Sequence, residues 1–308
     1  MAAASDLRSR VAARDLPDEG MRGSDVDKAR FLLVQDSDSV RILVTSLEAA
    51  DPTCVADAAA AVRSLAVSPA SAHAIVSMIC SPLCDATRRL VALHWTLPAI
   101  ARFCQFRECH PAFLAAGAVS ILEEQIVASV GEYAVVGALA LSFLSESEPR
   151  AARQVETRHL LAFVAALDAR LAISGSNEAQ RVVESRGFFG LPLYYRPRFI
   201  LQAILGAIAH GPPQHLMTAV RDTSLLHLLL GIARGELPND TPQNKPFGSP
   251  DARELVHALA RHLLDRMRIC EAAFSPDYAE HVATLEEALQ CTASPDVIGC
   301  PAVTLTSH

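Results

Sequence analysis

The sequence has 308 residues, of which 51% are hydrophobic, 20% charged and 5% aromatic, and its formal net charge is −7. This composition allows a large buried core and excludes a chain that is disordered throughout. The negative charge disfavours nucleic acid as a partner, because phosphate groups are repelled on average.

Lysine is almost absent, which narrows the enzyme classes. The two lysines, Lys28 and Lys245, lie in polar, loop-like surroundings. They provide neither a Gly-Lys-Ser/Thr phosphate-binding loop nor the strand lysine of a protein kinase. A His-Glu-x-x-His zinc motif and a Gly-x-Ser-x-Gly nucleophile motif are also missing. We therefore predict that the protein is not an enzyme, and we predict no cofactor.

The hydrophobic residues are distributed as in buried helices. No run of 18 or more apolar residues occurs, so we expect no membrane insertion. The N-terminal region has no apolar signal core, and acidic residues such as Asp6 and Asp15 disfavour a mitochondrial transit peptide. The eight cysteines have no framework spacing, which favours free thiols in a reducing compartment. We expect a cytoplasmic protein, with a mitochondrial or nuclear location left open.

In chain order, residues 1–30 are polar and mixed in charge, and we predict a mobile tail there. Beyond Asp38, apolar residues recur at the spacing of one helix face: Val40, Leu43, Val44 and Leu47. A second helix is predicted from Cys54 to Val67. It ends at Ser68-Pro69, because proline cannot continue a helix.

The clearest pattern lies between Glu108 and Ser145. The chain is predicted to turn at Gly117, where we expect a positive φ angle. An apolar run over 118–126 follows, and after a polar break a second run covers 132–144. The segment Ala-Gly-Ala-Val and the later small-residue run resemble an armadillo repeat, in which the first segment opens the long inner helix.

Similar breaks recur along the chain at a regular distance. The residues that mark them are Leu65, Phe103, Phe143 and Ile208, each followed within a few residues by a proline. The first two steps are 38 and 40 residues, and the third is 65 residues, which is one period plus an insert of roughly 25 residues. A period of about 40 residues is typical of armadillo and HEAT-type repeats. We predict that Leu65, Phe103 and Phe143 fill the layer between repeats.

The resemblance implies an all-α fold, an armadillo-like α-solenoid of about five helical repeat units with an insert loop after the third clear unit. We divide the chain into a tail (1–30), a repeat domain (31–272) and a C-terminal part (273–308). Within the domain, 174–197 is the insert and 235–250 is an exposed loop. Asp251 is predicted to cap a helix that ends near Cys270. A short helix over 277–289 and an irregular tail are predicted to follow.

Cysteine and histidine residues allow an alternative interpretation as metal ligands or catalytic groups. The candidates are Cys80, Cys84, Cys104, Cys109 and His110. Zinc sites favour closely spaced pairs, whereas these residues are separated by three or four others across apolar helices. Core cysteines are therefore favoured, and we predict no metal. His210, His215, His257 and His262 are predicted to lie at the surface or to cap helix ends.

The resemblance implies a non-catalytic scaffold or adaptor that binds a protein partner on an extended concave surface. The residues assigned to that surface are Arg41, Thr45, Ser120 and Glu124, followed by Arg158 and His227. The repeated Trp-x-x-x-Asn motifs of nuclear-import adaptors do not occur, since Trp95 is the sole tryptophan. A conventional nuclear-import cargo receptor is therefore disfavoured. An enzyme or zinc-dependent regulator, and a structural subunit of a larger assembly, are the alternatives.

The insert is the second candidate contact site. Its aromatic residues are Phe188, Phe189, Tyr194 and Tyr195, with Phe199 just beyond and Arg198 beside it. Aromatic residues with arginine are typical of binding hot spots. Alternatively, these rings fold back and fill the space between the third and fourth units.

Overall fold

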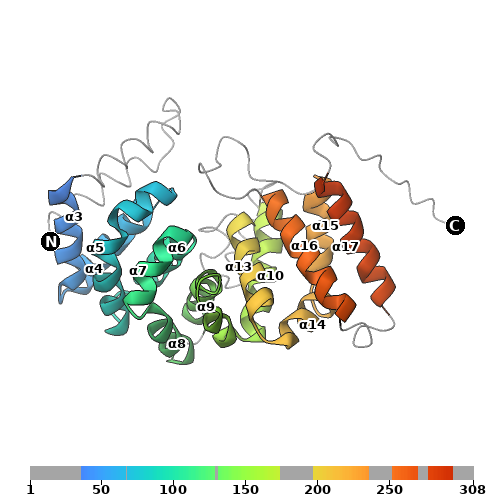
Figure 1. Ribbon diagram of the computed structural model, residues 1–308. Helices are drawn as coiled ribbons and strands as arrows, with labels where there is room; N and C mark the ends of the chain where they lie inside the picture. The colour runs from blue at the N-terminus through green and yellow to red at the C-terminus, as the bar shows by residue number, and fades with distance from the viewer. Residues whose placement is uncertain are drawn as a thin grey trace. The chain divides into compact units, whose positions relative to one another are not determined.

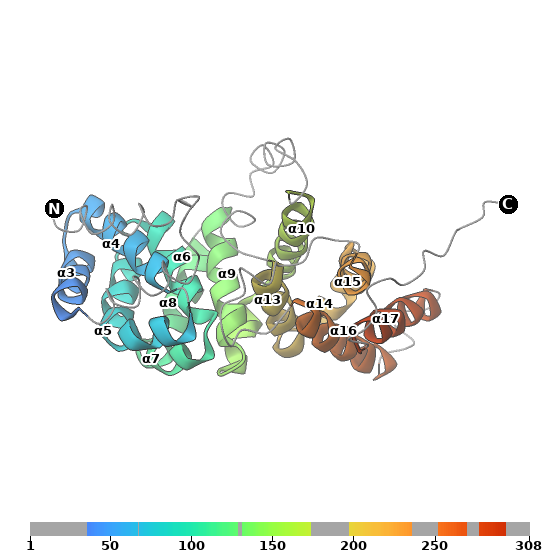
Figure 2. The same ribbon diagram turned by 90° about the horizontal axis from the view of Figure 1, so that it is seen from above.

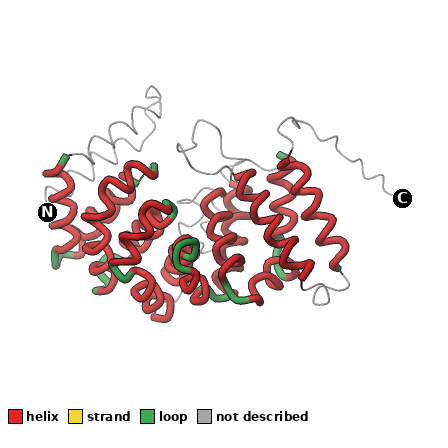
Figure 3. Tube along the Cα trace, viewed as in Figure 1, coloured by secondary structure: helices red, strands yellow, loops and turns green. Residues whose placement is uncertain are grey.

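The computed structural model describes residues 36–66, 68–128, 131–173, 197–235, 252–269 and 277–293. Across these ranges the chain forms helices and turns, and no strand (Figure 3). The predicted all-α fold is therefore confirmed. The chain divides into two compact units, and in the described residues the first ends at His159 and the second begins at Leu160. The predicted N-terminal tail, and the insert and the exposed loop apart from their edges, lie outside the described residues.

The described part of the first unit contains seven α-helices that follow one another closely (Figure 1). They are α3 (Ser37–Glu48), α4 (Pro52–Leu65), α5 (Pro69–Arg88), α6 (Leu93–Cys104), α7 (His110–Ala115), α8 (Ala118–Ala128) and α9 (Glu132–Leu144). Two 3-10 helices, Arg107–Cys109 and Pro149–Gln154, connect or follow them. The predicted helices after Asp38 and after Cys54 are confirmed, with starts shifted by one or two residues.

Local sequence explains the starts of α4 and α5. Both have proline in the first turn, where the missing N–H costs nothing. The Asp51 carboxylate accepts the Thr53 N–H at 3.2 Å. Ser68 and Ser71 form a reciprocal capping box at the start of α5. These caps fix the starts of two neighbouring helices.

The helices of the first unit form two layers. Helices α4, α6 and α9 pack side by side in one layer (Figure 2), while α3, α5 and α8 pack against them and each other in the second. Leu65, Phe103 and Phe143 are each at most 1% exposed, so their predicted core position is confirmed. The Phe103 ring also lies 6.1 Å from that of Phe113.

The two layers differ in how completely they are enclosed. Nearly every described side chain of α9 is buried, whereas α8 leaves Ser120 and Glu124 exposed. The turn before α8 contains Gly117 with φ +72°, which confirms the predicted left-handed glycine. Which layer lines a concave surface stays a prediction.

The second unit is built from α10 (Thr157–Ile173, from Leu160 onwards), α13 (Pro197–His210), α14 (Pro213–Arg221), α15 (Leu225–Arg234), α16 (Ala252–Ile269) and α17 (Tyr278–Ala293). Helix α16 packs on α13 and α17, and α17 also packs on α15 (Figure 1). Helices α16 and α17 confirm the helices predicted near 251–270 and 277–289. The predicted cap Asp251 lies outside the described residues.

None of the described helices is by itself long and apolar enough to cross a membrane. Taken together, α14 and α15 meet the criteria of length and composition, with a bend of 69° between them.

Candidate protein-binding surface

Arg63 and Trp95 form a cation–π pair where α4 meets α6. Arg63 lies in the last turn of α4, and its guanidinium carbon is 5.7 Å from the centre of the Trp95 ring in the first turn of α6. The His94 ring meets Trp95 edge-on, with 5.5 Å between centroids and an interplanar angle of 89°. All three side chains are partly exposed. Because tryptophan has the strongest cation–π attraction, this pair holds the Arg63 guanidinium against the ring.

Arg102 crosses the same junction from the other helix. Its Nε donates to the Ala66 carbonyl at 2.9 Å, just beyond the end of α4. Its Nη1 donates to Gln105 Oε1 at 3.1 Å, and the guanidinium lies 5.9 Å from the Phe106 ring centre. Helix ends leave carbonyls without intrahelical partners, so Arg102 caps α4 from the neighbouring repeat. We call Arg63, His94, Trp95 and Arg102 together the α4–α6 surface.

The α4–α6 surface carries charge of one sign. The only acidic residue within α4 is Asp57, which is buried, and α6 has no acidic residue. Arg63 and Arg102 are both partly exposed. This surface is therefore basic in a chain whose net charge is −7.

A strained turn places Trp95. Leu90 and Ala92, between α5 and α6, have φ angles of 58° and 50°, in the left-handed region. This conformation costs roughly 1–2 kcal/mol for a residue with a Cβ atom. The Ala92 carbonyl accepts the N–H groups of Trp95 and Thr96 at 2.8 and 3.0 Å, which starts α6.

Arg89 anchors the same turn to the rest of the unit. Its guanidinium donates to the Leu47 carbonyl at 3.0 Å and to the Ala49 carbonyl at 3.4 Å, at the end of α3. Leu90 next to it is 56% exposed. The turn therefore holds an exposed leucine close in sequence to His94 and Trp95.

The residues predicted for the concave surface are exposed but widely separated in the fold. Arg41 and Thr45 lie on α3, and Ser120 and Glu124 lie on α8, so these four belong to the second layer on either side of α5. Arg41 is paired with Asp38 at 3.0 Å.

Two further residues were assigned to the concave surface. Arg158 is exposed in the first turn of α10, where it pairs with Glu156 at 3.0 Å. His227 is exposed on α15. Their role in binding, like that of the four residues of α3 and α8, stays a prediction.

Of the aromatic residues in and next to the insert, only Phe199 lies in the described part of the chain. Phe188, Phe189, Tyr194 and Tyr195 lie outside the described residues, so their role stays a prediction. Phe199 and Arg198, which were grouped with them, are 3% and 2% exposed in α13. The Arg198 guanidinium lies 4.5 Å from the Phe199 ring centre. This end of the aromatic cluster therefore belongs to the core, because both residues lie in the first turn of α13.

Sequence reasoning missed Arg63, His94 and Arg102, and used Trp95 only to exclude an import receptor. A signal was available, since Arg63 lies two residues before Leu65 and Arg102 one residue before Phe103, and these two apolar residues mark similar points of two repeats. The pairing itself depends on how α4 packs against α6.

The four central cysteines are core residues, as predicted. Cys80, Cys84, Cys104 and Cys109 are all buried free thiols. Burial raises the pKa of Cys84 and Cys109 to about 12 and that of Cys104 well above its ordinary value. Such thiols remain protonated and react slowly. In the described part of the chain, no three His, Cys, Asp or Glu side chains are grouped closely enough to hold a metal ion.

Both ring nitrogens of His110 form hydrogen bonds within the protein. Nε2 lies 2.8 Å from the Cys104 carbonyl and Nδ1 lies 2.7 Å from the Ser147 hydroxyl. A carbonyl only accepts, so Nε2 carries the proton and Nδ1 accepts from Ser147. Burial lowers the pKa of His110. Both nitrogens of the neutral ring are therefore engaged.

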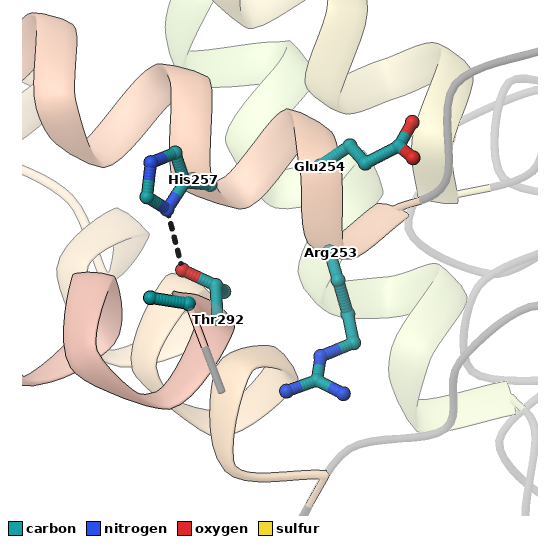
Figure 4. A pocket seen from close by; sticks show the side chains of 5 residues that line it. Arg253, Glu254, His257 and Thr292 are labelled. Atoms are coloured by element: carbon teal, nitrogen blue, oxygen red, sulfur yellow. Dashed lines mark hydrogen bonds between the residues drawn. The ribbon is translucent and has the colours of Figure 1, made fainter. Parts of the chain in front are cut away.

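The described part of the second unit has an open cavity of about 400 Å³ between the start of α16 and the end of α17 (Figure 4). Arg253, Glu254, His257 and Thr292 line it, and Glu254 points away from the other three. Arg253 donates to the Cys291 carbonyl at 2.6 Å.

Thr292 fixes the tautomer of His257. Its hydroxyl donates to the Ala288 carbonyl at 3.0 Å. It therefore accepts from His257 Nδ1, which lies 2.9 Å away. These contacts attach α17 to α16, which is a structural role.

Of the two roles predicted for His215, surface residue or helix cap, the structure shows the cap. The histidine is 1% exposed, and its Nδ1 lies 3.0 Å from the Ala207 carbonyl in the last turn of α13. It caps that helix from a buried position. Gly211 allows this approach, because a Cβ atom there would lie 2.1 Å from the Ala207 carbonyl oxygen and 2.6 Å from His215 Nδ1.

No family model matches the sequence, and no curated protein is similar to it. Among solved structures, one engineered protein has a TM-score of 0.39 and 17% identity, covering 82% of this chain and 96% of that chain. A designed armadillo repeat protein has a TM-score of 0.38 and 14% identity, covering 83% and 99%. Another, solved in complex with the peptide (KR)4, has a TM-score of 0.36 and 15% identity, covering 83% and 99%. At these TM-scores and identities, the likenesses carry no argument about the family or the function of this chain.

Proposed function

We propose that the chain is a non-catalytic protein-interaction scaffold that binds a protein partner through the α4–α6 surface. The observation that carries the proposal is the Arg63–Trp95 pair, in which the sole tryptophan is left partly exposed and stacked with an arginine. Tryptophan and arginine are the residues most enriched at binding hot spots.

The physical reason is the low cost of ordering this surface. Trp95 is packed against His94 and Arg63 before any partner arrives, so little side-chain entropy is lost on binding. The remaining exposed ring and the Leu90 side chain provide apolar area for a partner to cover. Arg63 and Arg102 supply polar contacts around it.

The surface is also built from two successive repeats, α4 with its neighbours and α6 with its neighbours. Repeat proteins form extended binding surfaces by repeating such junctions. The predicted concave residues and the aromatic insert remain further contact sites within this proposal, and a cytoplasmic location remains part of it.

The test is capture of a protein partner by the full-length chain and three variants. Trp95→Phe keeps an aromatic ring in place but removes indole area and weakens the cation–π attraction. Arg63→Gln removes the cation and keeps a similar side-chain length. Met78→Ala is the matched control, since Met78 is an exposed apolar residue (47%) on α5 in the second layer.

We expect one protein to be retained by the wild-type chain and by Met78→Ala, and to be lost or strongly reduced with Trp95→Phe and Arg63→Gln. Thermal melting of each variant accompanies the capture, so that loss of fold is recognised. Equal retention by all four proteins contradicts the proposed surface. Retention that depends on Met78 instead assigns binding to the second layer.

A further inference from the structure

We infer that the flank of α4 that faces away from α6 is a docking surface, and that residues 24–35 of the same chain occupy it. This docking goes beyond the proposed partner binding and is independent of it. Three features support it: how completely α4 is enclosed, the alternation of the two layers along the chain, and the sequence of the segment that precedes α3.

Helix α4 is as enclosed as α6, although it lies at the end of their common layer. Among the described helices of this layer, α6 has neighbours on both sides, α4 and α9, whereas α4 has only α6 (Figure 2). Even so, nine of the fourteen residues of α4 are buried, compared with eight of the twelve residues of α6. Helix α3, at the same end of the second layer, buries only four of its twelve residues. The end of the layer that contains α4 is therefore covered.

The buried residues of α4 include those on the flank opposite α6. Arg63 faces α6, because its guanidinium lies over the Trp95 ring. At about 100° per residue, Cys54 and Ala61 lie roughly 180–200° around the helix from Arg63. They are 8% and 1% exposed. Helices α3 and α5 approach α4 from the second layer, so a further part of the chain covers this flank.

The order of the helices indicates which part of the chain that is. Apart from the short α7, successive helices of the first unit alternate between the layers: α3 lies in the second, α4 in the first, and so on to α9. The segment before α3 is therefore expected in the layer of α4. Helix α3 begins at Ser37 with Asp36 as its N-cap, and a short connection places consecutive helices side by side and antiparallel.

The sequence of residues 24–35 suits a helix of this kind. Ser24 and Asp27 have the spacing of a capping box. The apolar run 31–34 follows, and consecutive apolar residues lie on more than one side of a helix, as expected where neighbours cover it. Twelve helical residues extend about 18 Å, close to the roughly 21 Å of α4.

The charges also match. Asp57 is the only acidic residue in α4 and is 8% exposed. It lies one turn before Ala61, so both share the covered flank. A carboxylate is seldom buried without a cation or hydrogen-bond donors, and the segment carries Lys28 and Arg30. With this segment docked, the repeat domain begins near residue 24 instead of residue 31.

Hydrogen exchange of the wild-type, full-length chain is the first test. We expect amides within residues 26–34 to exchange at least about 100-fold more slowly than in an unfolded peptide, because a docked segment opens rarely. The protection should be equal at low and high protein concentration. Exchange at the rate of an unfolded peptide overturns the inference. Protection that appears only at high concentration also overturns it and assigns the flank to a second copy of the chain.

A substitution in the segment tests what the segment covers. Leu33→Asp places a charge in the apolar run and should release the segment. Exchange in α4 should then accelerate, and the buried Cys54 thiol should react with a maleimide at least about fivefold faster. Cys104 in α6 should react as in the wild-type chain. Met78→Asp is the matched control and should change neither readout, since Met78 is an exposed apolar residue on α5.

The contrary results are equally definite. Faster exchange of residues 26–34 with no change in α4 or in Cys54 shows that the segment docks elsewhere, which overturns the inference. If Leu33→Asp also accelerates exchange in α9, the whole unit has been loosened. The milder Leu33→Ala then decides by the same two readouts: a change confined to residues 26–34 and α4 supports the docking, and an unchanged α4 and Cys54 overturn it.

Discussion

The apolar layer of the first unit and helix α17 of the second unit are held in place by different kinds of contact. In the first unit, α4, α6 and α9 meet through almost wholly buried apolar faces, and α9 is apolar along nearly its whole length. In the second unit, α17 buries only Leu285, Ala288 and Cys291. It is attached through polar side chains, among them an ion pair of Arg234 with Glu287 and one of Arg268 with Glu286 at 3.1 Å.

This difference separates two sources of stability. Apolar packing is sensitive to the loss of volume and insensitive to salt. A helix held by partly exposed ion pairs depends on ionic strength and gains little from each pair. Helix α17 and the apolar layer of the first unit should therefore respond to different perturbations.

One type of contact, a helix end capped by an arginine, is nevertheless common to both units. Arginines cap the carbonyls of a helix end about one repeat away in sequence: Arg89 to Leu47 (42 residues), Arg102 to Ala66 (36 residues) and Arg253 to Cys291 (38 residues). Helix ends leave carbonyls that need such donors. The separations match the period of about 40 residues in the sequence, so the repeat is visible in its contacts as well as in its pattern.

The largest expected effect tests the apolar packing of the first unit. Phe143→Ala should cost about 3–5 kcal/mol, because the side chain is 1% exposed and its loss leaves a cavity. Helices α6 and α8 pack on α9, so hydrogen exchange should accelerate in both. Chemical denaturation gives the free energy. Loosening confined to α9 would show that Phe143 does not connect the repeats.

Gly211→Ala makes the corresponding test of close packing in the second unit. A Cβ atom at Gly211 would meet a backbone oxygen at 2.1 Å, so the end of α13 or the His215 contact must shift. We expect a loss of roughly 1–3 kcal/mol, the usual cost of overpacking. Gly137→Ala is the control, since a Cβ atom there would meet the flexible side chain of Ile126 at 3.2 Å and not a backbone atom. Equal effects of the two changes would contradict the crowding at Gly211.

Gly117→Val tests a turn where space is free but conformation is restricted. Nothing lies within 4 Å of a Cβ atom at Gly117, yet its φ angle is +72°. A β-branched residue there should cost more than about 1 kcal/mol. Gly117→Asn should cost less, since asparagine tolerates the left-handed region. An unchanged melting temperature for Gly117→Val would remove the turn assignment.

Acidification should lower the stability of both units, through the buried His110 in the first and the partly buried His262 in the second. Burial lowers the pKa of His110 in the first unit and of His262 in the second, below the ordinary value of about 6.5. Between the lowered and the ordinary pKa the unfolded chain binds more protons, so stability falls as pH decreases through this window. His110→Asn should flatten the decline in the first unit only, as measured by hydrogen exchange of each unit. A parallel change in the second unit would contradict the assignment.

Much of the fold could be predicted from the sequence because it depends on local signals. The prolines and Gly117 mark helix ends. The regular spacing of Leu65, Phe103 and Phe143 marks core positions. The Arg63–Trp95 pair could not be predicted with the same means. It joins side chains 32 residues apart, and it depends on rotamers and on the packing of α4 against α6. For Phe199 the sequence left open whether the ring is a contact site or folds back into the protein, and in α13 the ring is buried.

The smallest expected effect concerns the ion pair of α17. The side chains of Arg234 and Glu287 are 31% and 43% exposed, so Glu287→Gln should cost at most about 1 kcal/mol. The effect should appear as faster hydrogen exchange in α17 at low salt and should shrink as salt is raised, because screening already weakens the pair in the wild-type chain. Phe143→Ala should show no such salt dependence. If the Glu287→Gln effect is large and independent of salt, α17 is held mainly by its three buried side chains and the contrast between the units disappears.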